Sequence, residues 1–196
     1  RNDPIVYSPE SVSSLVNITD KQILRLTRLV EDMLDITRIQ NGKLTLNVEK
    51  IDFAVLLEEV LNNFQEEYRR ANCELTFDIA EGLMISGDRY RLEQVITNLL
   101  SNALKYGNGC PVHVRLFREQ EELVLSVKDQ GIGIDEESKE RIFERFERAV
   151  SPATIGGLGL GLYITRQIVE LHHGKIIVES TLGKGSVFTL RFPSNG

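Results

Sequence analysis

The sequence predicts an α+β protein, in which one mixed β-sheet carries three helices on one face and a long N-terminal helix precedes the sheet. Two observations favour this class. A helical pattern runs without interruption to Asn41 and Gly42, and the patterns after it combine two hairpins with separate helices instead of alternating strictly. Strict alternation is typical of doubly wound parallel sheets, so its absence favours one sheet with helices layered against it.

The first helix is expected over residues 9–41. Ser8, Pro9 and Glu10 provide a start signal, namely a capping side chain, a proline at the first helical position and an acidic first turn. An apolar stripe follows at spacings of three and four residues, formed by Ile23, Leu26, Val30 and Met33. A stripe of this length is typical of a helix that packs on a partner helix. We expect that partner to lie outside these 196 residues or in another chain.

The remaining elements are expected after Gly42, in a domain over residues 43–196 that is separate from residues 1–42. Asp52 and Asp88 are expected to cap helices that end near Asn72 and Lys105. Strands are expected over residues 44–48, 75–79, 83–86, 112–118, 123–129, 176–180 and 186–192. Further helices are expected over residues 136–146 and 160–172.

Composition excludes several classes of function. The formal net charge is −6 and no basic run occurs, which disfavours binding to nucleic acid or to an anionic membrane surface. Cys73 and Cys110 show no metal-ligand spacing and are expected to be reduced thiols in a cytoplasmic protein. No apolar run approaches the ~18 residues of a membrane span, so we expect no direct membrane contact.

Three polar residues form a stripe on the helix after Asp88. Asn98, Asn102 and Lys105 recur at intervals of four and three residues and therefore share one face. A solvated face is the plain alternative, but asparagine is a poor helix former. Amide oxygens are hard ligands for magnesium, and an ammonium group offsets phosphate charge, so the stripe suits a magnesium-bound polyphosphate.

Asp129 ends the apolar row Leu123, Leu125, Val127 of the strand over residues 123–129. A carboxylate on a buried face needs a hydrogen-bond donor. A salt bridge or a turn cap would provide one, and so would the amino group of an adenine. Gly131 and Gly133 follow directly, as expected where the backbone approaches a ligand closely.

A glycine-rich turn precedes the last long helix. Free N–H groups at such a helix start suit a phosphate, and its residues are Gly157, Leu158, Gly159, Leu160, Gly161 and Leu162. It is not a Walker loop, because no Gly-Lys-Ser/Thr follows, and residues 149–155 do not form a good Rossmann strand. The nucleotide would therefore be held by another fold.

Four segments resemble the conserved boxes of sensor histidine kinases from two-component systems, in the order and spacing of that family. They are the N box at residues 98–106, the first glycine box at 129–133, the F box at 141–146 and the second glycine box at 157–162. Residues 183–188 are also similar to the family's final strand pair, and the resemblance spans residues 15–193. Four boxes in order form a highly specific signal.

The resemblance implies a Bergerat-type two-layer fold that binds ATP with Mg²⁺. It implies that Asn102 holds the magnesium, with Asn98 and Lys105 at the phosphates. Tyr106 would lie by the adenine and Asp129 would accept from its amino group.

An ATP lid is implied over residues 147–158. Arg148 would lie near the γ-phosphate, and Phe143 and Phe146 would anchor the lid.

Asn98 bears on the choice between related activities. In hydrolysing relatives such as DNA gyrase and the mismatch-repair ATPases, a glutamate at this position activates water. An amide has no suitable lone pair for that proton, so we expect a kinase, in which ATP is retained for another nucleophile.

The family's phosphoacceptor is a histidine followed by an acidic residue, on the first helix of a dimerisation hairpin. His113, His172 and His173 are the three histidines here and none precedes Asp or Glu, so we expect no autophosphorylation. His113 is expected in a strand, and His172 and His173 at a helix end, where positive charge is favourable.

The helix over residues 9–41 resembles the hairpin's second helix, which implies homodimerisation in the whole protein and a response-regulator receiver domain as partner. A serine-directed kinase of the anti-sigma-factor type and a non-catalytic nucleotide-binding scaffold remain the alternatives.

Overall fold

The computed structural model describes residues 9–147 and 158–194. The chain divides into two compact units, residues 1–44 and 45–196, and each is described by itself. The first unit contains one helix, α1 (Pro9–Gln40), which is 32 residues long. It ends where Gly42 adopts a positive φ of 61° and the N–H of Lys43 donates to the carbonyl of Arg38 at 2.8 Å. None of the helices in the described ranges is both long enough and apolar enough to span a bilayer.

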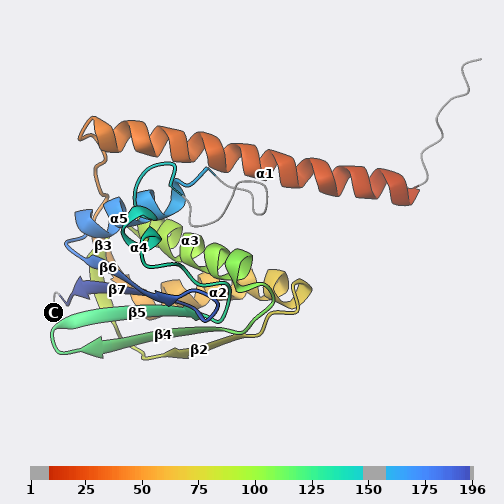
Figure 1. The fold of residues 1–196 in the computed structure, drawn as a ribbon. Coiled ribbons are helices and arrows are strands. Elements are labelled where there is room, and N and C mark those ends of the chain that lie inside the picture. The colour runs from red at the N-terminus through yellow and green to blue at the C-terminus, as the bar shows by residue number, and fades with distance from the viewer. Residues whose placement is uncertain (1–8, 148–157, 195–196) are drawn as a thin grey trace, which may run out of the picture. The chain divides into compact units, whose positions relative to one another are not determined.

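The second unit contains the mixed sheet and the remaining helices (Figure 1). Its helices are α2 (Phe53–Arg70), α3 (Arg89–Gly107), α4 (Ser138–Arg141) and α5 (Gly161–Leu171). Its strands are β1 (Glu49–Asp52), β2 (Leu75–Ile79), β3 (Met84–Gly87), β4 (Val112–Glu119), β5 (Glu122–Asp129), β6 (Lys175–Thr181) and β7 (Gly185–Pro193).

Aspartate side chains start α2 and α3, as expected. The Asp52 carboxylate accepts from the N–H of Ala54 at 3.1 Å, and the Asp88 carboxylate accepts from the N–H of Arg91 at 3.1 Å. These bonds satisfy donors that have no partner within the helix. At the other end of α3, Asn108 adopts the left-handed conformation with φ 51°, which asparagine tolerates better than most residues.

The main sheet has five strands in the order β2-β4-β5-β7-β6. The β2–β4 pair is parallel, and the pairs β4–β5, β5–β7 and β6–β7 are antiparallel. The sheet is therefore mixed, as expected. β1 and β3 form a separate antiparallel pair, in which Ile51 lies opposite Ile85.

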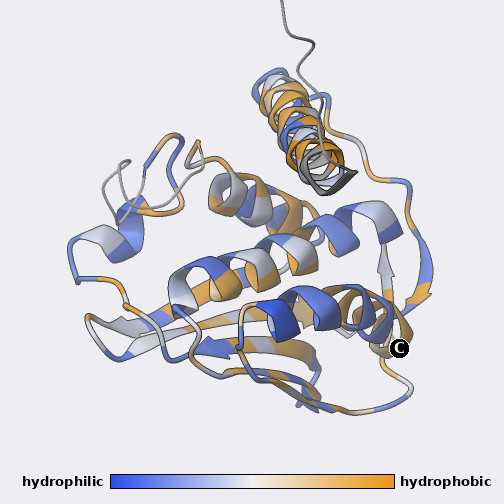
Figure 2. Ribbon diagram, turned by 90° about the vertical axis from the view of Figure 1, so that its right-hand side faces the viewer, coloured by the Kyte–Doolittle hydropathy of each residue, from blue (hydrophilic) through white to orange (hydrophobic). Residues whose placement is uncertain are grey.

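Helices α2, α3 and α5 lie against one face of the main sheet (Figures 1 and 2). Apolar side chains fill the space between these two layers, including Phe53 and Phe192, whose rings meet edge to face at 5.9 Å. Tyr68 on α2 is 1% exposed and its hydroxyl donates to the carbonyl of Leu100 at 2.8 Å, which ties α2 to α3. The expectation of an α+β two-layer fold with three helices on one face is confirmed.

Two local predictions are wrong. Residues 44–48 do not form a strand; the strand begins at Glu49, because pairing with β3 selects residues 49–52 over the apolar alternation before them. The helix expected over residues 136–146 is limited to Ser138–Arg141, and Phe146 has a positive φ of 65°, which no right-handed helix contains.

Candidate nucleotide site

The polar stripe of α3 includes one side chain that contacts the neighbouring helix. Asn98 and Asn102 are half-buried and Lys105 is exposed. The amide nitrogen of Asn98 donates to the hydroxyl of Thr165 on α5 at 2.8 Å, and Thr165 is 1% exposed. The Asn98 amide therefore joins α3 to α5, a role that its expected place at the phosphates did not anticipate.

Gly161 leaves room for this contact at the start of α5. A Cβ atom there would lie 2.3 Å from the Asn98 side-chain oxygen, which is closer than real Cβ atoms approach. The third glycine of the glycine-rich turn is thus required by packing against α3.

The rest of the glycine-rich turn runs into α5. Leu158 is exposed, Leu160 is buried, Leu162 is half-buried, and Gly159 has a positive φ of 71°. The carbonyl of Gly159 accepts from the N–H of Phe146 at 3.0 Å, so the turn is connected to the end of the F box. Gly157, Arg148 and nearly all of the expected lid at residues 147–158 lie outside the described residues.

Asp129 lies at the end of β5 and is 5% exposed. One of its carboxylate oxygens accepts from the N–H of Gly131 at 2.9 Å. Burial raises the pKa of Asp129, while backbone N–H groups of Gly131 and Ser186 act in the opposite direction. Its position agrees with the expected row on the buried face, and its bond to Gly131 is that of a short turn.

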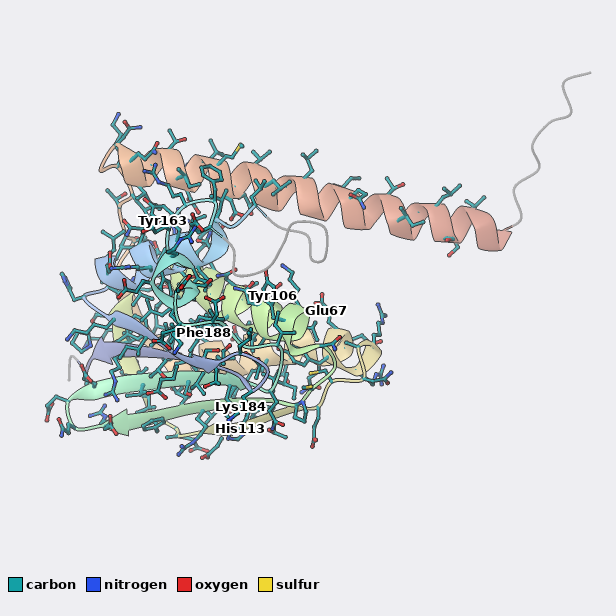
Figure 3. The ribbon with its side chains drawn as sticks, in the orientation of Figure 1. Glu67, Tyr106, His113, Tyr163, Lys184 and Phe188 are labelled. Atoms are coloured by element: carbon teal, nitrogen blue, oxygen red, sulfur yellow. The ribbon has the colours of Figure 1, made fainter. Side chains whose placement is uncertain are left out.

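The two glycines after Asp129 lie against backbone. A Cβ atom on Gly131 would lie 2.0 Å from the carbonyl oxygen of Tyr106, and one on Gly133 would lie 2.0 Å from that of Thr181. The N–H of Ile132 also donates to the Tyr106 carbonyl at 3.1 Å. This glycine box is therefore fixed against the last turn of α3, where the half-buried Tyr106 lies (Figure 3). The structure thus brings Tyr106 and Asp129 to neighbouring positions.

The two phenylalanines of the F box differ in environment. Phe143 is 8% exposed and lies 5.9 Å from the Arg166 guanidinium. Phe146 is 64% exposed. Phe146 therefore lies at the surface and meets the glycine-rich turn through its backbone N–H.

A buried histidine at the end of α5 is a feature that the sequence pattern did not reveal. The Nδ1–H of His172 donates to the carbonyl of Ile168 at 2.8 Å, and Nε2 accepts from the N–H of Asp88 at 3.0 Å. Burial lowers the pKa of His172 and so favours its neutral ring, although a positive charge would be favourable at a helix end. The structural role expected for this residue is borne out by these bonds.

Asp88 also holds the segment that enters the second unit. Its second carboxylate oxygen accepts from the N–H of Asn47 at 2.8 Å. One residue therefore caps α3, donates to His172 of α5 and binds the backbone before β1. The sequence predicted only the capping role of Asp88, because Asn47 and His172 lie far from it along the chain.

The family model for histidine kinase-, DNA gyrase B-, and HSP90-like ATPases matches residues 87–196, from the end of β3 to the C-terminus. The chain belongs to this ATPase family. The four boxes that predicted it all lie within the matched region, and the named histidine kinases among the relatives confirm the expected resemblance to sensor histidine kinases.

The relatives of this ATPase domain include named histidine kinases. The circadian input-output histidine kinase CikA of Synechococcus elongatus is 37% identical over 174 residues, which are 86% of this chain and 23% of CikA. The crystal structure of full-length ShkA in complex with AMPPNP has a TM-score of 0.79 at 25% identity and covers 96% of this chain and 40% of ShkA. The crystal structure of histidine kinase ThkA with the response regulator TrrA has a TM-score of 0.71 at 27% identity and covers 97% of this chain and 53% of that one. The chain thus spans about a quarter of the curated relative's length.

Proposed function

We propose that this domain binds Mg·ATP and is the ATP-binding catalytic part of a sensor histidine kinase. It would transfer the γ-phosphate to a histidine on a helical hairpin, for relay to an aspartate of a response-regulator receiver domain. Family membership, the AMPPNP in the related ShkA structure and the response regulator in the ThkA structure support this. Residues 9–41 would be the second helix of that hairpin and would contribute to a homodimer.

The buried Asp129 carboxylate is the observation that carries the proposal. A carboxylate can accept about four hydrogen bonds, and the three backbone N–H groups that bond to it, those of Gly131, Ser186 and Asp129 itself, leave acceptor capacity. The exocyclic amino group of adenine is a suitable further donor. Guanine presents a carbonyl oxygen at the equivalent position, which would face the carboxylate unfavourably, so a preference for ATP over GTP follows.

The residues present fit a magnesium ion that arrives with the triphosphate. Across residues 9–147 and 158–194 no group of three or more His, Cys, Asp or Glu side chains is placed to hold a metal. Magnesium is commonly bound by substrate phosphates with one or two protein ligands, and Asn102 would supply one amide oxygen. The ion would offset phosphate charge there, while Lys105 would add a cation from the same helix face.

Nucleotide titrations of the Asp129→Asn variant test the adenine contact. A hydrogen bond to a charged group contributes about 1.5–3 kcal/mol, so ATP affinity should fall about 10- to 100-fold. Asp78→Asn is the matched control, because Asp78 is an exposed aspartate on β2 with a side chain that is 73% accessible. Thermal melts of both variants check that a loss of ATP affinity does not come from unfolding. Equal affinities of the unaltered domain for ATP and GTP would overturn this assignment.

Phosphoryl transfer is tested with labelled ATP and a separate histidine-containing dimerisation hairpin. We expect incorporation that is stable in base and labile in acid, as for phosphohistidine. An acid-stable product on serine would instead favour the anti-sigma-factor type of kinase. ATP binding without transfer to either substrate would favour the nucleotide-binding scaffold.

A further inference from the structure

The two cysteines lie side by side at the start of neighbouring strands. The parallel pair β2–β4 begins with Leu75 opposite Val112, and each cysteine precedes its member of that pair by two residues. The Cys73 thiol donates to the carbonyl oxygen of Cys110 at 2.6 Å. Neighbouring strands lie about 4.8 Å apart, which is within the Cα–Cα range of about 4.4–6.8 Å that a disulfide spans.

The backbone at both positions is held by the end of a helix. The N–H of Cys73 donates to the carbonyl of Tyr68 in α2 at 3.0 Å. The N–H of Cys110 donates to the carbonyl of Gly107 in α3 at 2.9 Å. Both cysteines are thus anchored beside each other at the ends of α2 and α3.

The two thiols differ in accessibility, and this difference sets an order of reaction. Cys73 is 5% exposed, whereas Cys110 is half-buried. Burial raises the pKa of Cys73, and the neighbouring Cys110 raises it further. The thiolate is the attacking species, so the more accessible Cys110 reacts first with a dissolved disulfide and Cys73 acts afterwards.

We propose that Cys73 and Cys110 form a reversible disulfide by exchange with a low-molecular-weight disulfide such as oxidised glutathione. The Cys110 thiolate attacks one glutathione sulfur, forms a mixed disulfide and releases one glutathione thiolate. Cys73 then loses its proton and its sulfur attacks that of Cys110, which releases the second glutathione. Two electrons pass from the protein thiols to the glutathione disulfide, and the two thiol protons end on the two glutathiones or in solvent.

The cross-link would restrain the end of α3. Cys110 lies four residues after Tyr106, and the residues between them include Asn108 and Gly109, both with positive φ. A disulfide would join this turn to the end of α2. Oxidation is thereby expected to slow amide exchange in the turn that follows Tyr106, whether or not a nucleotide is bound.

Native mass spectrometry and peptide mapping after incubation with oxidised glutathione test the proposal. The unaltered chain should lose two hydrogen atoms in mass and yield one cross-linked peptide that contains both cysteines, and dithiothreitol should reverse this. Closing the loop between the cysteines should raise the melting temperature by at least about 5 °C.

Single variants separate the two steps. Cys73→Ser should accumulate a glutathione mixed disulfide at Cys110, because no thiol is left to displace it. Cys110→Ser should remain unmodified under the same conditions, because the remaining thiol is buried. Glutathione retained on the unaltered chain without a cross-linked peptide, or equal modification of the two variants, would overturn the proposal.

Discussion

The contact between Asn98 and Thr165 can be removed from either side. Asn98→Ala deletes the amide donor and leaves the buried Thr165 hydroxyl without it. Thr165→Val removes the hydroxyl at nearly constant volume and leaves the half-buried Asn98 amide with partial access to water. We therefore expect the first variant to lose more stability than the second.

The magnitudes follow from burial. An unpaired buried polar group costs about 1–3 kcal/mol of stability, whereas a neutral hydrogen bond contributes a net stabilisation of about 0.5–1.5 kcal/mol. Asn98→Ala should thus lose about 2 kcal/mol of unfolding free energy and Thr165→Val about 1 kcal/mol. For a domain of this size, 1 kcal/mol corresponds to a shift in melting temperature of about 2–4 °C. Asn98→Ala should melt about 4–8 °C lower.

A double-mutant cycle measures the contact itself. The double variant should be less destabilised than the sum of the single variants by about 0.5–1.5 kcal/mol. Thr165→Ser keeps the hydroxyl and should restore the coupling. Asn63→Ala, at an exposed position of α2, should change the unfolding free energy by less than about 0.5 kcal/mol. Additive single effects would show that the two side chains do not interact and would refute the reasoning.

Three further predictions concern histidines and the apolar stripe. Because the pKa of His172 is lower in the folded state, the unfolded chain binds a proton at a higher pH, and stability should fall as the pH drops below about 6.5. In thermal melts, His172→Gln should flatten this dependence of stability on pH. An unchanged dependence would exclude the ring as its source. Incubation with labelled ATP should leave His113, His172 and His173 unphosphorylated, and mass spectrometry that finds phosphate on any of them would contradict this. The apolar stripe on α1, in which Leu26 is 62% and Met33 57% exposed, should promote self-association. Sedimentation should show less self-association in the variant Leu26→Glu/Met33→Glu. A monomeric unaltered chain would contradict this.

Features that depend on local sequence could be predicted well. Asp52 and Asp88 cap α2 and α3 as expected because a cap bonds to N–H groups two or three residues away. The hairpins β4–β5 and β6–β7 were also recognisable, since their strands are neighbours in sequence. The order of the four boxes identified the family, because such boxes are specific in combination.

Features that depend on distant partners could not be predicted. The start of β1 is set by pairing with β3, more than thirty residues later. The Asn98 amide bonds to a residue 67 positions away, and the Nε2 of His172 accepts from one 84 positions away. No local pattern encodes such pairs, so Asn98 was recognised as polar and helical while its partner Thr165 was missed.

The hydrogen bond between Asn47 and Asp88 would carry tension from the segment before β1 to the start of α3. A pull on the chain at residue 45 would act on the N–H of Asn47, and that group is held by the Asp88 carboxylate. The same carboxylate anchors the first turn of α3, and the backbone N–H of Asp88 is held by His172. The load would therefore enter the helix that carries Asn98 and Asn102 before it reaches any strand of the five-stranded sheet. A displacement of the chain before Asn47 would therefore be transmitted through Asp88 to the first turn of α3.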